Sequence, residues 1–383
     1  MKSLPPIPSL FPKNNRKTIA YFWIRYWTLF FIFLPWILVR QIGISFSNLL
    51  AALWTWNQEV VLLPDTLRLI YMNNFFSLFV SVIFGERFTA LHYRDILFDP
   101  GPIFSWKKIK RYVAKRSDSI HALVLTHAHE EHIGNVPTVL AELSVPVYAT
   151  SATLQAIKNP ESLSIARKVF IGQPISNDIE NMKSLETTVD TPDISLQVIQ
   201  SPGHCDGHAS FYDPKRCILF VGDSFMHTVF TSPNRDVSGA DWIRTLKNYC
   251  KLDIRTMIGA HGYVYTSDET ILRNRFVVRR KDPKQMIQDK LRFMEWARDV
   301  VMEGERIGLP YSVIEACLFP WQSWWSWYTW FTDESGRLFS AGEFSRTHFL
   351  RSFSSFPENV PFRFPIFANL ISRLKKFLTK KKF

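Results

Sequence analysis

The stretch Leu125-Thr-His-Ala-His-Glu-Glu-His-Ile-Gly-Asn135 decides how this sequence is interpreted. It places three histidines and two carboxylates in six positions, directly after the apolar run Ala122–Leu125, which predicts a buried strand. His127 and His129 lie two positions apart on an expected extended loop and can reach one cation together. His132 and a carboxylate can turn toward a second. Imidazole and carboxylate are ligands of Zn²⁺, and also of Fe or Mn, so the stretch predicts a metal site at a strand end.

Three later segments carry the same kind of signal. Gln200-Ser-Pro-Gly-His-Cys-Asp-Gly-His208 sets a histidine between two glycines, which allow the backbone to turn tightly. Leu219-Phe-Val-Gly-Asp-Ser224 predicts a buried strand that ends at an aspartate, and Met257-Ile-Gly-Ala-His-Gly262 predicts one that ends at a histidine. The candidate residues of these three segments are His204, Asp223 and His261.

The order of the four motifs resembles that of the metallo-β-lactamase superfamily, from about Glu59 to Tyr265. The family's motifs read His-x-His-x-acid-His, then Pro-Gly-His, then Gly-Asp at a strand end, then Gly-x-His-Gly. Any one of them alone would be a weak signal, whereas four in the right order are specific. The resemblance implies an α/β fold of the four-layer αββα sandwich type.

The resemblance also implies a ligand set. One metal would be held by His127, His129 and His204, and a second by Glu131, His132 and His261, with Asp223 bridging the two. Zinc is the expected cofactor, at one or two ions per chain, with Fe or Mn as alternatives. A metal-bound hydroxide would be the nucleophile.

The resemblance implies an orienting role for Asp99, in Phe98-Asp-Pro-Gly101, although a simple turn residue is the alternative there. Glu131 departs from the family, which has Asp at this position. Glutamate is one methylene longer, so the second site could be kept, weakened, given a different metal or lost. Glu130 occupies a variable position of the family and is not counted as a ligand.

The expected reaction follows from the spacing between His204 and His208, which resembles the glyoxalase II and thioesterase-like branch. We expect a hydrolase of a small-molecule ester, thioester, lactone or lipid-type substrate. One alternative is a phosphodiesterase or nuclease that uses the same metals and the basic charge. Nucleic acid is less favoured, because no clamp domain lies between Asp223 and His261. The other alternative is a non-catalytic metal-binding or scaffold protein in which Glu131 disables the second site.

Composition points to a membrane surface as a partner. The 383 residues are 15% aromatic, more than one soluble core requires, and the net charge is +12. The apolar stretches Thr18–Val39 and Ile42–Trp56 favour an interfacial anchor; a span or hairpin and a soluble helical cap are the alternatives. The segment Trp321–Trp330 contains five tryptophans. Three interpretations stay open for them: a segment that covers the core, a belt at the membrane interface, or an apolar wall of the substrate site. The basic start favours a cytoplasmic-face location.

The basic end of the chain fits the same expectation, or a frayed, solvated terminus. Its charges are Arg373, Lys375, Lys376, Lys380, Lys381 and Lys382. The four cysteines form no disulfide pattern, and the sequence leaves the oligomeric state open.

Four regions are expected along the chain: an aromatic, apolar amino-terminal segment, a catalytic domain, a helical Trp-rich extension and a basic tail. Their bounds are 1–58, 59–268, 269–356 and 357–383. Within the catalytic domain, short apolar runs bounded by turn residues predict strands, among them Phe75–Phe84. From Glu269 onward the pattern predicts helices.

Overall fold

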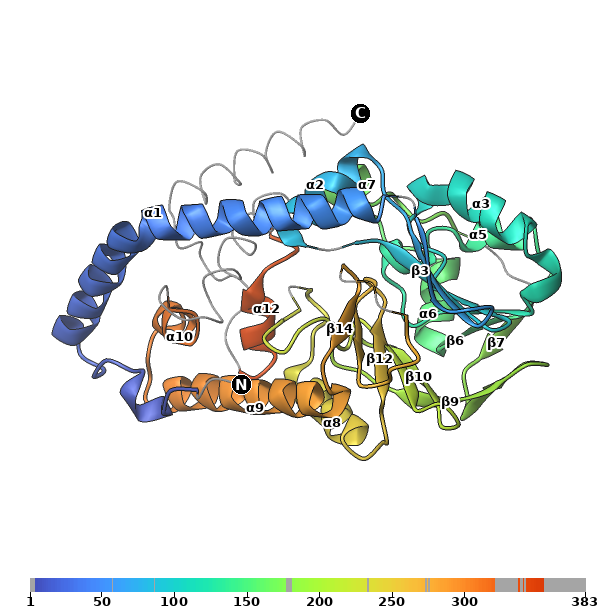
Figure 1. The fold of residues 1–383 in the computed structure, drawn as a ribbon. Coiled ribbons are helices and arrows are strands. Elements are labelled where there is room, and N and C mark those ends of the chain that lie inside the picture. The colour runs from blue at the N-terminus through green and yellow to red at the C-terminus, as the bar shows by residue number, and fades with distance from the viewer. Residues whose placement is uncertain are drawn as a thin grey trace.

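The computed structural model describes residues 4–354 apart from 57, 86, 177–180, 233, 273, 275, 321–336, 338, 339 and 341. The Trp-rich segment 321–330 and the basic tail lie outside the described residues, so the expectations for them stay predictions. Two sheets form the centre of the molecule, and helices cover the outer face of each (Figure 1).

The first sheet has seven strands in sequence order. Strands β1 to β4 are antiparallel neighbours, and β4 to β7 run parallel. The strands are β1 (Glu59–Leu63), β2 (Leu67–Tyr71), β3 (Thr89–Tyr93), β4 (Ile96–Phe98), β5 (Ala122–Val124), β6 (Val147–Ala149) and β7 (Met182–Ser184).

The second sheet also has seven strands, in the order β14 to β8. Strands β8 to β11 are antiparallel, β11 and β12 are parallel, and β13 pairs antiparallel with β12 and parallel with β14. The strands are β8 (Thr188–Asp190), β9 (Ser195–Gln200), β10 (Ala209–Asp213), β11 (Ile218–Gly222), β12 (Thr256–Gly259), β13 (Val264–Thr266) and β14 (Val278–Arg280).

Apolar side chains fill the space between the two sheets. The Phe98 ring stacks on Phe220 at 5.2 Å between centroids and meets Phe211 edge-on at 5.4 Å. The outer face of the first sheet packs against α3, α5 and α6, and that of the second against α8, α9 and α10. This arrangement is the predicted four-layer αββα sandwich, which is confirmed.

The helices that the structure describes surround these sheets. The α-helices are α1 (Arg16–Trp54), α2 (Phe75–Phe84), α3 (Trp106–Ala114), α4 (Glu130–Ile133), α5 (Val136–Leu140), α6 (Ser151–Lys158), α7 (Ile165–Phe170), α8 (Gly239–Tyr249), α9 (Pro283–Arg306), α10 (Tyr311–Leu318) and α12 (Arg346–Arg351). The short 3₁₀ helices are η1 (Ile7–Ser9), η2 (Ile103–Ser105) and η3 (Ser117–Ser119).

Two secondary-structure predictions are wrong. Phe75–Phe84 is helix α2 and not a strand, because Asn74 and Ser77 form a reciprocal capping box and Gly85 ends the helix with a left-handed backbone. The region after Glu269 is not wholly helical, since β14 pairs with β13 and extends the second sheet past residue 268. The chain therefore returns to the sheet once more before α9 begins.

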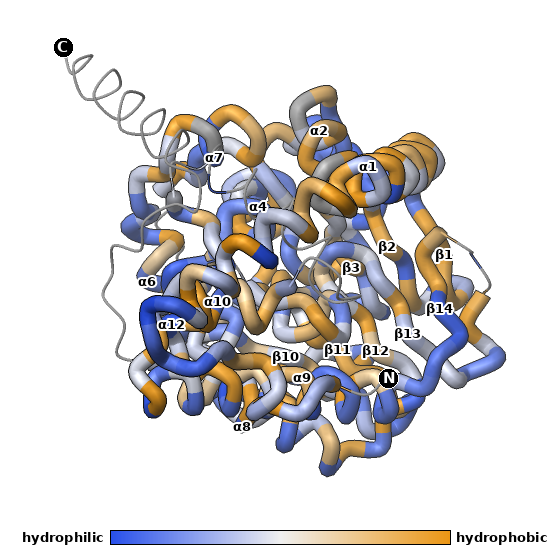
Figure 2. Tube along the Cα trace, turned by 90° about the vertical axis from the view of Figure 1, so that its left-hand side faces the viewer, coloured by the Kyte–Doolittle hydropathy of each residue, from blue (hydrophilic) through white to orange (hydrophobic). Residues whose placement is uncertain are grey.

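The two amino-terminal apolar stretches form one continuous helix of 39 residues, with Pro35 inside it. Helix α1 begins beside α9 and α10, bends, and runs across the molecule to α2 (Figure 1). Asn48 Nδ2 donates to the carbonyl of Val82, next to the end of α2. In Figure 2, α1, α2 and α7 lie along one edge of the molecule, and much of α1 and α2 is apolar.

Candidate metal centre

All seven candidate ligands lie at one edge of the sandwich, where strands of both sheets end. His127, His129, Glu131 and His132 follow β5, and His204 lies on the loop between β9 and β10. Asp223 follows β11 and His261 follows β12, and the two strands are parallel, so their carboxyl ends lie side by side. The ligand atoms form two clusters, in each of which they lie within 4.8 Å of one another: His127, His129, His204 and Cys205, and Glu131, His132, Asp223 and His261.

The first cluster is built around three ring nitrogens. His129 Nδ1 lies 3.0 Å from His127 Nε2 and 3.2 Å from His204 Nε2. Zn–N bonds of about 2.0–2.1 Å in a tetrahedron separate the nitrogens by roughly 3.3 Å. The spacing of the three nitrogens therefore fits a single cation of zinc size.

Asp223 lies between the two clusters. Its Oδ2 is 3.1 Å from His261 Nε2 and 3.4 Å from His132 Nε2, and it also lies 3.6 Å from His204 Nε2. A carboxylate oxygen that faces ligands of both clusters has the position of a bridging ligand. Glu131 reaches the second cluster despite its different length, because its carboxylate is one of the four groups that come within 4.8 Å.

Buried polar atoms at this edge are without hydrogen-bond partners. Among the described residues these include Nδ1 of His204 and Oδ1 of Asp223. Buried polar atoms in folded proteins are normally paired, so such a group indicates a missing ion or water. The donor set, with imidazoles in both clusters and carboxylates in the second, suits a zinc-like ion.

The Asp223 carboxylate and the imidazoles around it shift one another's pKa values, and a bound cation would take the place of a proton. Burial opposes the charged form of Asp223, but the imidazoles of His261 and His132 outweigh it and hold the pKa of the carboxyl well below its usual value. Burial likewise opposes a charged His132, yet Asp223 raises the pKa of His132 well above its ordinary value. Burial and the neighbouring His132 lower the pKa of His127. Without a metal the centre thus keeps a proton on His132, and a bound cation would displace it.

Hydrogen bonds on the far side of the rings fix which nitrogen faces the centre. Asp99 has a left-handed backbone with φ +44°, which turns its carboxylate toward Thr126. Oδ1 of Asp99 accepts from the Thr126 amide at 2.8 Å and Oδ2 from the Thr126 hydroxyl at 2.7 Å. The same hydroxyl lies 2.9 Å from His127 Nδ1, so Nδ1–H can donate to it. In that tautomer Nε2 is unprotonated and can bind a metal. His261 Nδ1 is similarly 2.9 Å from the carbonyl of Arg87.

Asp99 also lies 3.2 Å from His132 Nδ1 through its Oδ2. It therefore contacts a ligand of each cluster, directly or through one hydroxyl, without itself facing the centre. This geometry is compatible with the orienting role that the resemblance implies for Asp99, which stays a prediction.

His208 supports Asp223 from behind. Its Nε2 accepts from the Asp223 amide at 3.1 Å, and its Nδ1 lies 2.8 Å from the Ser201 hydroxyl. Gly222, with φ +52°, must be glycine here, since a Cβ atom would lie 2.5 Å from the His208 ring. Both ring nitrogens of His208 are thus engaged, and its Nε2 holds the backbone at Asp223.

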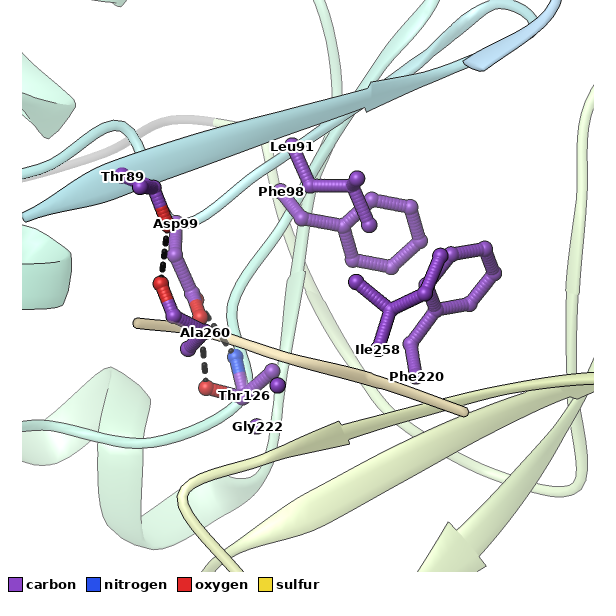
Figure 3. Close-up of a pocket in the computed structure, with 10 residues that line it drawn as sticks. Thr89, Leu91, Phe98, Asp99, Thr126, Phe220, Gly222, Ile258 and Ala260 are labelled. Carbon is purple, nitrogen blue, oxygen red and sulfur yellow. Dashed lines mark hydrogen bonds between the residues drawn. The ribbon is translucent and has the colours of Figure 1, made fainter. Parts of the chain in front are cut away.

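A small cavity lies behind the ligands, between the sheets (Figure 3). Its apolar side is formed by Leu91, Phe98, Phe220 and Ile258, and its polar side includes Thr89, Asp99 and Thr126. The cavity volume is about 20 Å³, which is enough for one water molecule. The cavity is too small for a substrate and belongs to the floor of the centre.

Sequence reasoning missed three contacts of this centre. Glu130 is buried and accepts two hydrogen bonds from the Arg167 guanidinium of α7, which holds the start of α4 in place. Asp236 Oδ2 lies 3.7 Å from His129 Nε2, on the side away from the centre. Cys205 belongs to the first cluster. Only Cys205 had a signal in the sequence, its position next to His204, because the other two partners come from distant segments.

Comparison with known proteins agrees with this geometry. Residues 94–261 match the family model of the metallo-beta-lactamase superfamily. The chain carries a metallo-beta-lactamase superfamily domain. Proteins of this superfamily are metal-dependent hydrolases that bind one or two metal ions. The family predicted from the four motifs is therefore confirmed.

Individual relatives cover parts of this domain. A hydroxyacylglutathione hydrolase of Idiomarina loihiensis is 29% identical over 129 residues, 34% of this chain and 41% of the relative. Ribonuclease J2 of Bacillus subtilis is 47% identical over 47 residues, 12% of this chain and 8% of the relative. The BLEG-1 B3 metallo-beta-lactamase structure has a TM-score of 0.40 and 23% identity, covering 55% of this chain and 93% of that one. The matches span 41 to 57% of the first three hydroxyacylglutathione hydrolases.

Shortening Glu131 tests whether the second site of this superfamily domain is built around glutamate. The Glu131 carboxylate reaches the second cluster in the present backbone, so Glu131→Asp should withdraw one ligand by the length of a methylene. We expect zinc affinity at the second site to fall about tenfold, as for the loss of a supporting contact. Titration with zinc against a competing chelator measures this. Unchanged binding by Glu131→Asp would show that Glu131 is not a ligand, and tighter binding would show that glutamate is a poor ligand at this position.

Proposed function

We propose that the protein is a metal-dependent hydrolase of thioesters or related acyl compounds, acting at a membrane surface. The observation that carries the hydrolase part is the position of Asp223 Oδ2, within 3.1 to 3.9 Å of nitrogens from four histidines. Burying several imidazoles around one carboxylate costs free energy unless a cation is bound, so this arrangement supports a metal site.

The proposed chemistry divides between the two clusters and their supports. His127, His129 and His204 would hold one ion, and Glu131, His132 and His261 the other, with Asp223 shared. When bound, the metals would lower the pKa of a coordinated water and polarise the scissile carbonyl. Asp99 and Thr126 keep the nearby imidazole in the tautomer that a metal requires.

The acyl substrate class is supported by the relatives and by the spacing of His204 and His208. Several matched proteins are named hydroxyacylglutathione hydrolases. A phosphodiesterase or nuclease is the second candidate. It is favoured by the short match to ribonuclease J2 and by the net charge of +12.

Metal analysis and a substrate screen test this proposal together. Protein purified without added metal should contain about two metal ions per chain, by inductively coupled plasma mass spectrometry. It should hydrolyse a hydroxyacylglutathione thioester faster than bis(p-nitrophenyl) phosphate, and a chelator should abolish both the metal and the activity. Faster cleavage of the phosphodiester would support the second candidate. A chain that binds no metal, even when metal is supplied, would refute both and leave the scaffold alternative.

The membrane part of the proposal rests on α1. The helix is apolar enough to cross a bilayer, with a mean hydropathy of 1.8 over 18 residues, of which 17% are buried. Its exposed large apolar side chains are Tyr21, Ile24, Phe31, Ile32, Trp36, Leu38, Val39, Ile42, Phe46, Leu50, Leu53 and Trp54. Phe75 of α2 and Ile165 and Val169 of α7 are also exposed. Helices α2 and α7 lie on the same edge of the molecule as α1 (Figure 2). Soluble proteins rarely expose so large an apolar face.

The contacts at the two ends of α1 favour an interfacial helix over a span. Before its first turn, Asn14 Nδ2 donates to the carbonyl of Ile307 at the end of α9. At its last turn, the Trp54 ring lies 5.0 Å from that of Phe276, next to β14. Because both ends contact the folded part of the protein after residue 268, α1 runs along the protein instead of leaving it. Its outward face alone would then enter the lipid.

Charge favours an anionic lipid surface. The first 58 residues contain six basic residues and no acidic one. Anionic headgroups attract such segments by about 1 kcal/mol for each basic residue near the surface. The cytoplasmic leaflet, which carries the anionic lipids, is the proposed location.

A further inference from the structure

Cys205 lies inside the first metal cluster but outside the ligand set predicted from the sequence. Its sulfur and one ring nitrogen of each of His127, His129 and His204 lie within 4.8 Å of one another. A tetrahedral zinc with three nitrogens and one sulfur separates nitrogen from sulfur by roughly 3.6 Å. The four atoms are thus close enough to share one ion after small side-chain rotations.

The surroundings of Cys205 differ from those of a cysteine that only packs in an apolar core. Its side chain is buried, with 3% of the residue exposed, and forms no disulfide. It sits on the tight loop between β9 and β10, directly after His204, whose Nδ1 is buried without a hydrogen-bond partner. The loop is fixed by Gly203, where a Cβ atom would lie 2.4 Å from the Trp242 backbone, so Cys205 cannot move far from the cluster.

We propose that Cys205 is a further protein ligand of the first metal, an inference that rests on the proposed metal-dependent function. On binding, the thiol loses its proton to solvent and the sulfur forms a bond to the metal, with no change of oxidation state. The first site is then a three-nitrogen, one-sulfur set beside the shared Asp223 carboxylate, and the sulfur favours zinc or cadmium. The second site, with two nitrogens and two carboxylates, suits harder ions such as manganese or iron.

This ligand set assigns different roles to the two sites. Cys205 adds to the three imidazoles and the shared Asp223 carboxylate, so the first ion would have no open position, whereas catalytic sites keep one. The first ion would be held more tightly than the second, and the open position would fall at the second site. Glu131, the residue that departs from the family, belongs to that second site.

Cobalt substitution tests the proposal without any activity measurement. Co²⁺-loaded protein should show visible d–d absorption from its nitrogen ligands and, in addition, a near-ultraviolet thiolate-to-cobalt charge-transfer band. The band should be absent from Cys205→Ala and Cys205→Ser, while the d–d absorption remains. Cys317→Ala is the matched control, because Cys317 is equally buried, at 3%, but lies in the core around α9 and α10. It should keep the band.

The outcomes separate this inference from the proposed function. Native protein with d–d absorption and no charge-transfer band would overturn the role of Cys205 and leave the metal site intact. Native protein with neither signal would overturn the metal site itself. As a second readout, zinc affinity of the first site should fall at least about 100-fold in Cys205→Ala, more than for loss of a supporting contact. An unchanged affinity would also overturn the proposal.

Discussion

The variant His129→Ala is expected to lose the metal of the first site and more than about 100-fold of its hydrolytic rate. Even a residue that only supports a metal ligand contributes about 10–100-fold in affinity or activity. His129 contributes more directly, since its Nδ1 is the nitrogen closest to both other imidazoles, at 3.0 and 3.2 Å. Metal content by inductively coupled plasma mass spectrometry and initial rates on a thioester measure the two effects.

His129 is a suitable choice because its loss should leave the fold intact. Its side chain is partly exposed, at 15%, whereas those of His127 and His132 are almost fully buried. Removing it therefore opens a site at the rim and leaves no cavity in the core. Thermal unfolding of the metal-free variant should match that of the metal-free native protein.

His121→Ala is the matched control. It also removes a histidine beside a carboxylate, since His121 Nδ1 lies 3.2 Å from Asp95, but it lies before β5 and outside both clusters. It should keep metal and activity. If His129→Ala also kept both, the assignment of the first site would be wrong.

The fold and the ligands were predictable because the motifs are local. The strands before His127, Asp223 and His261 are fully buried runs bounded by turn residues, and each was predicted within two residues of its observed ends. Strand β3 was missed, since Thr89 and His92 interrupt its apolar pattern although all five residues are buried. Its place between β2 and β4 buries both faces of the strand, which a local pattern cannot show.

Longer-range contacts set the limit of the prediction. The run Phe75–Phe84 has high strand propensity, but its ten residues exceed the usual strand and its cap at Asn74 selects a helix. Glu130 was set aside as a variable position, and its half-buried partner Arg167 lies 37 residues away. The thiol of Cys205 is placed among the imidazoles by the turn at Gly203, which packs against Trp242 of α8. None of these partners is adjacent in the sequence.

Exchanging four apolar residues on the outward face of α1 for glutamine is expected to lower binding to anionic vesicles about 10³-fold. The variant combines Phe31→Gln, Val39→Gln, Ile42→Gln and Phe46→Gln, whose residues are 59 to 70% exposed. Full burial of such a side chain contributes about 1.5–3 kcal/mol, so transfer of the exposed part contributes about 1 kcal/mol each. Four of them give about 4 kcal/mol, or about 10³-fold in partition.

Co-sedimentation with vesicles of phosphatidylcholine and phosphatidylglycerol measures this partition. The variant should keep its thermal unfolding and metal content, because none of the four side chains belongs to a buried cluster of the protein. The double variant Leu272→Gln and Met302→Gln is the control: it removes exposed apolar side chains, 46 and 54% exposed, that lie outside α1. It should bind vesicles as the native protein does.

Two results would contradict the role of α1. In the first, the native protein does not bind anionic vesicles but forms dimers in sedimentation velocity, and the four-residue variant is monomeric. This result would show that a second copy of the chain covers the outward face of α1. A variant that still binds vesicles would place the anchor in the Trp-rich segment or the basic tail. The expected result instead ties membrane binding to the helix whose two ends contact the end of α9 and the segment before β14. The metal centre would then be held at a fixed orientation to the lipid, because α1 is packed against the rest of the protein and not joined to it by a flexible linker.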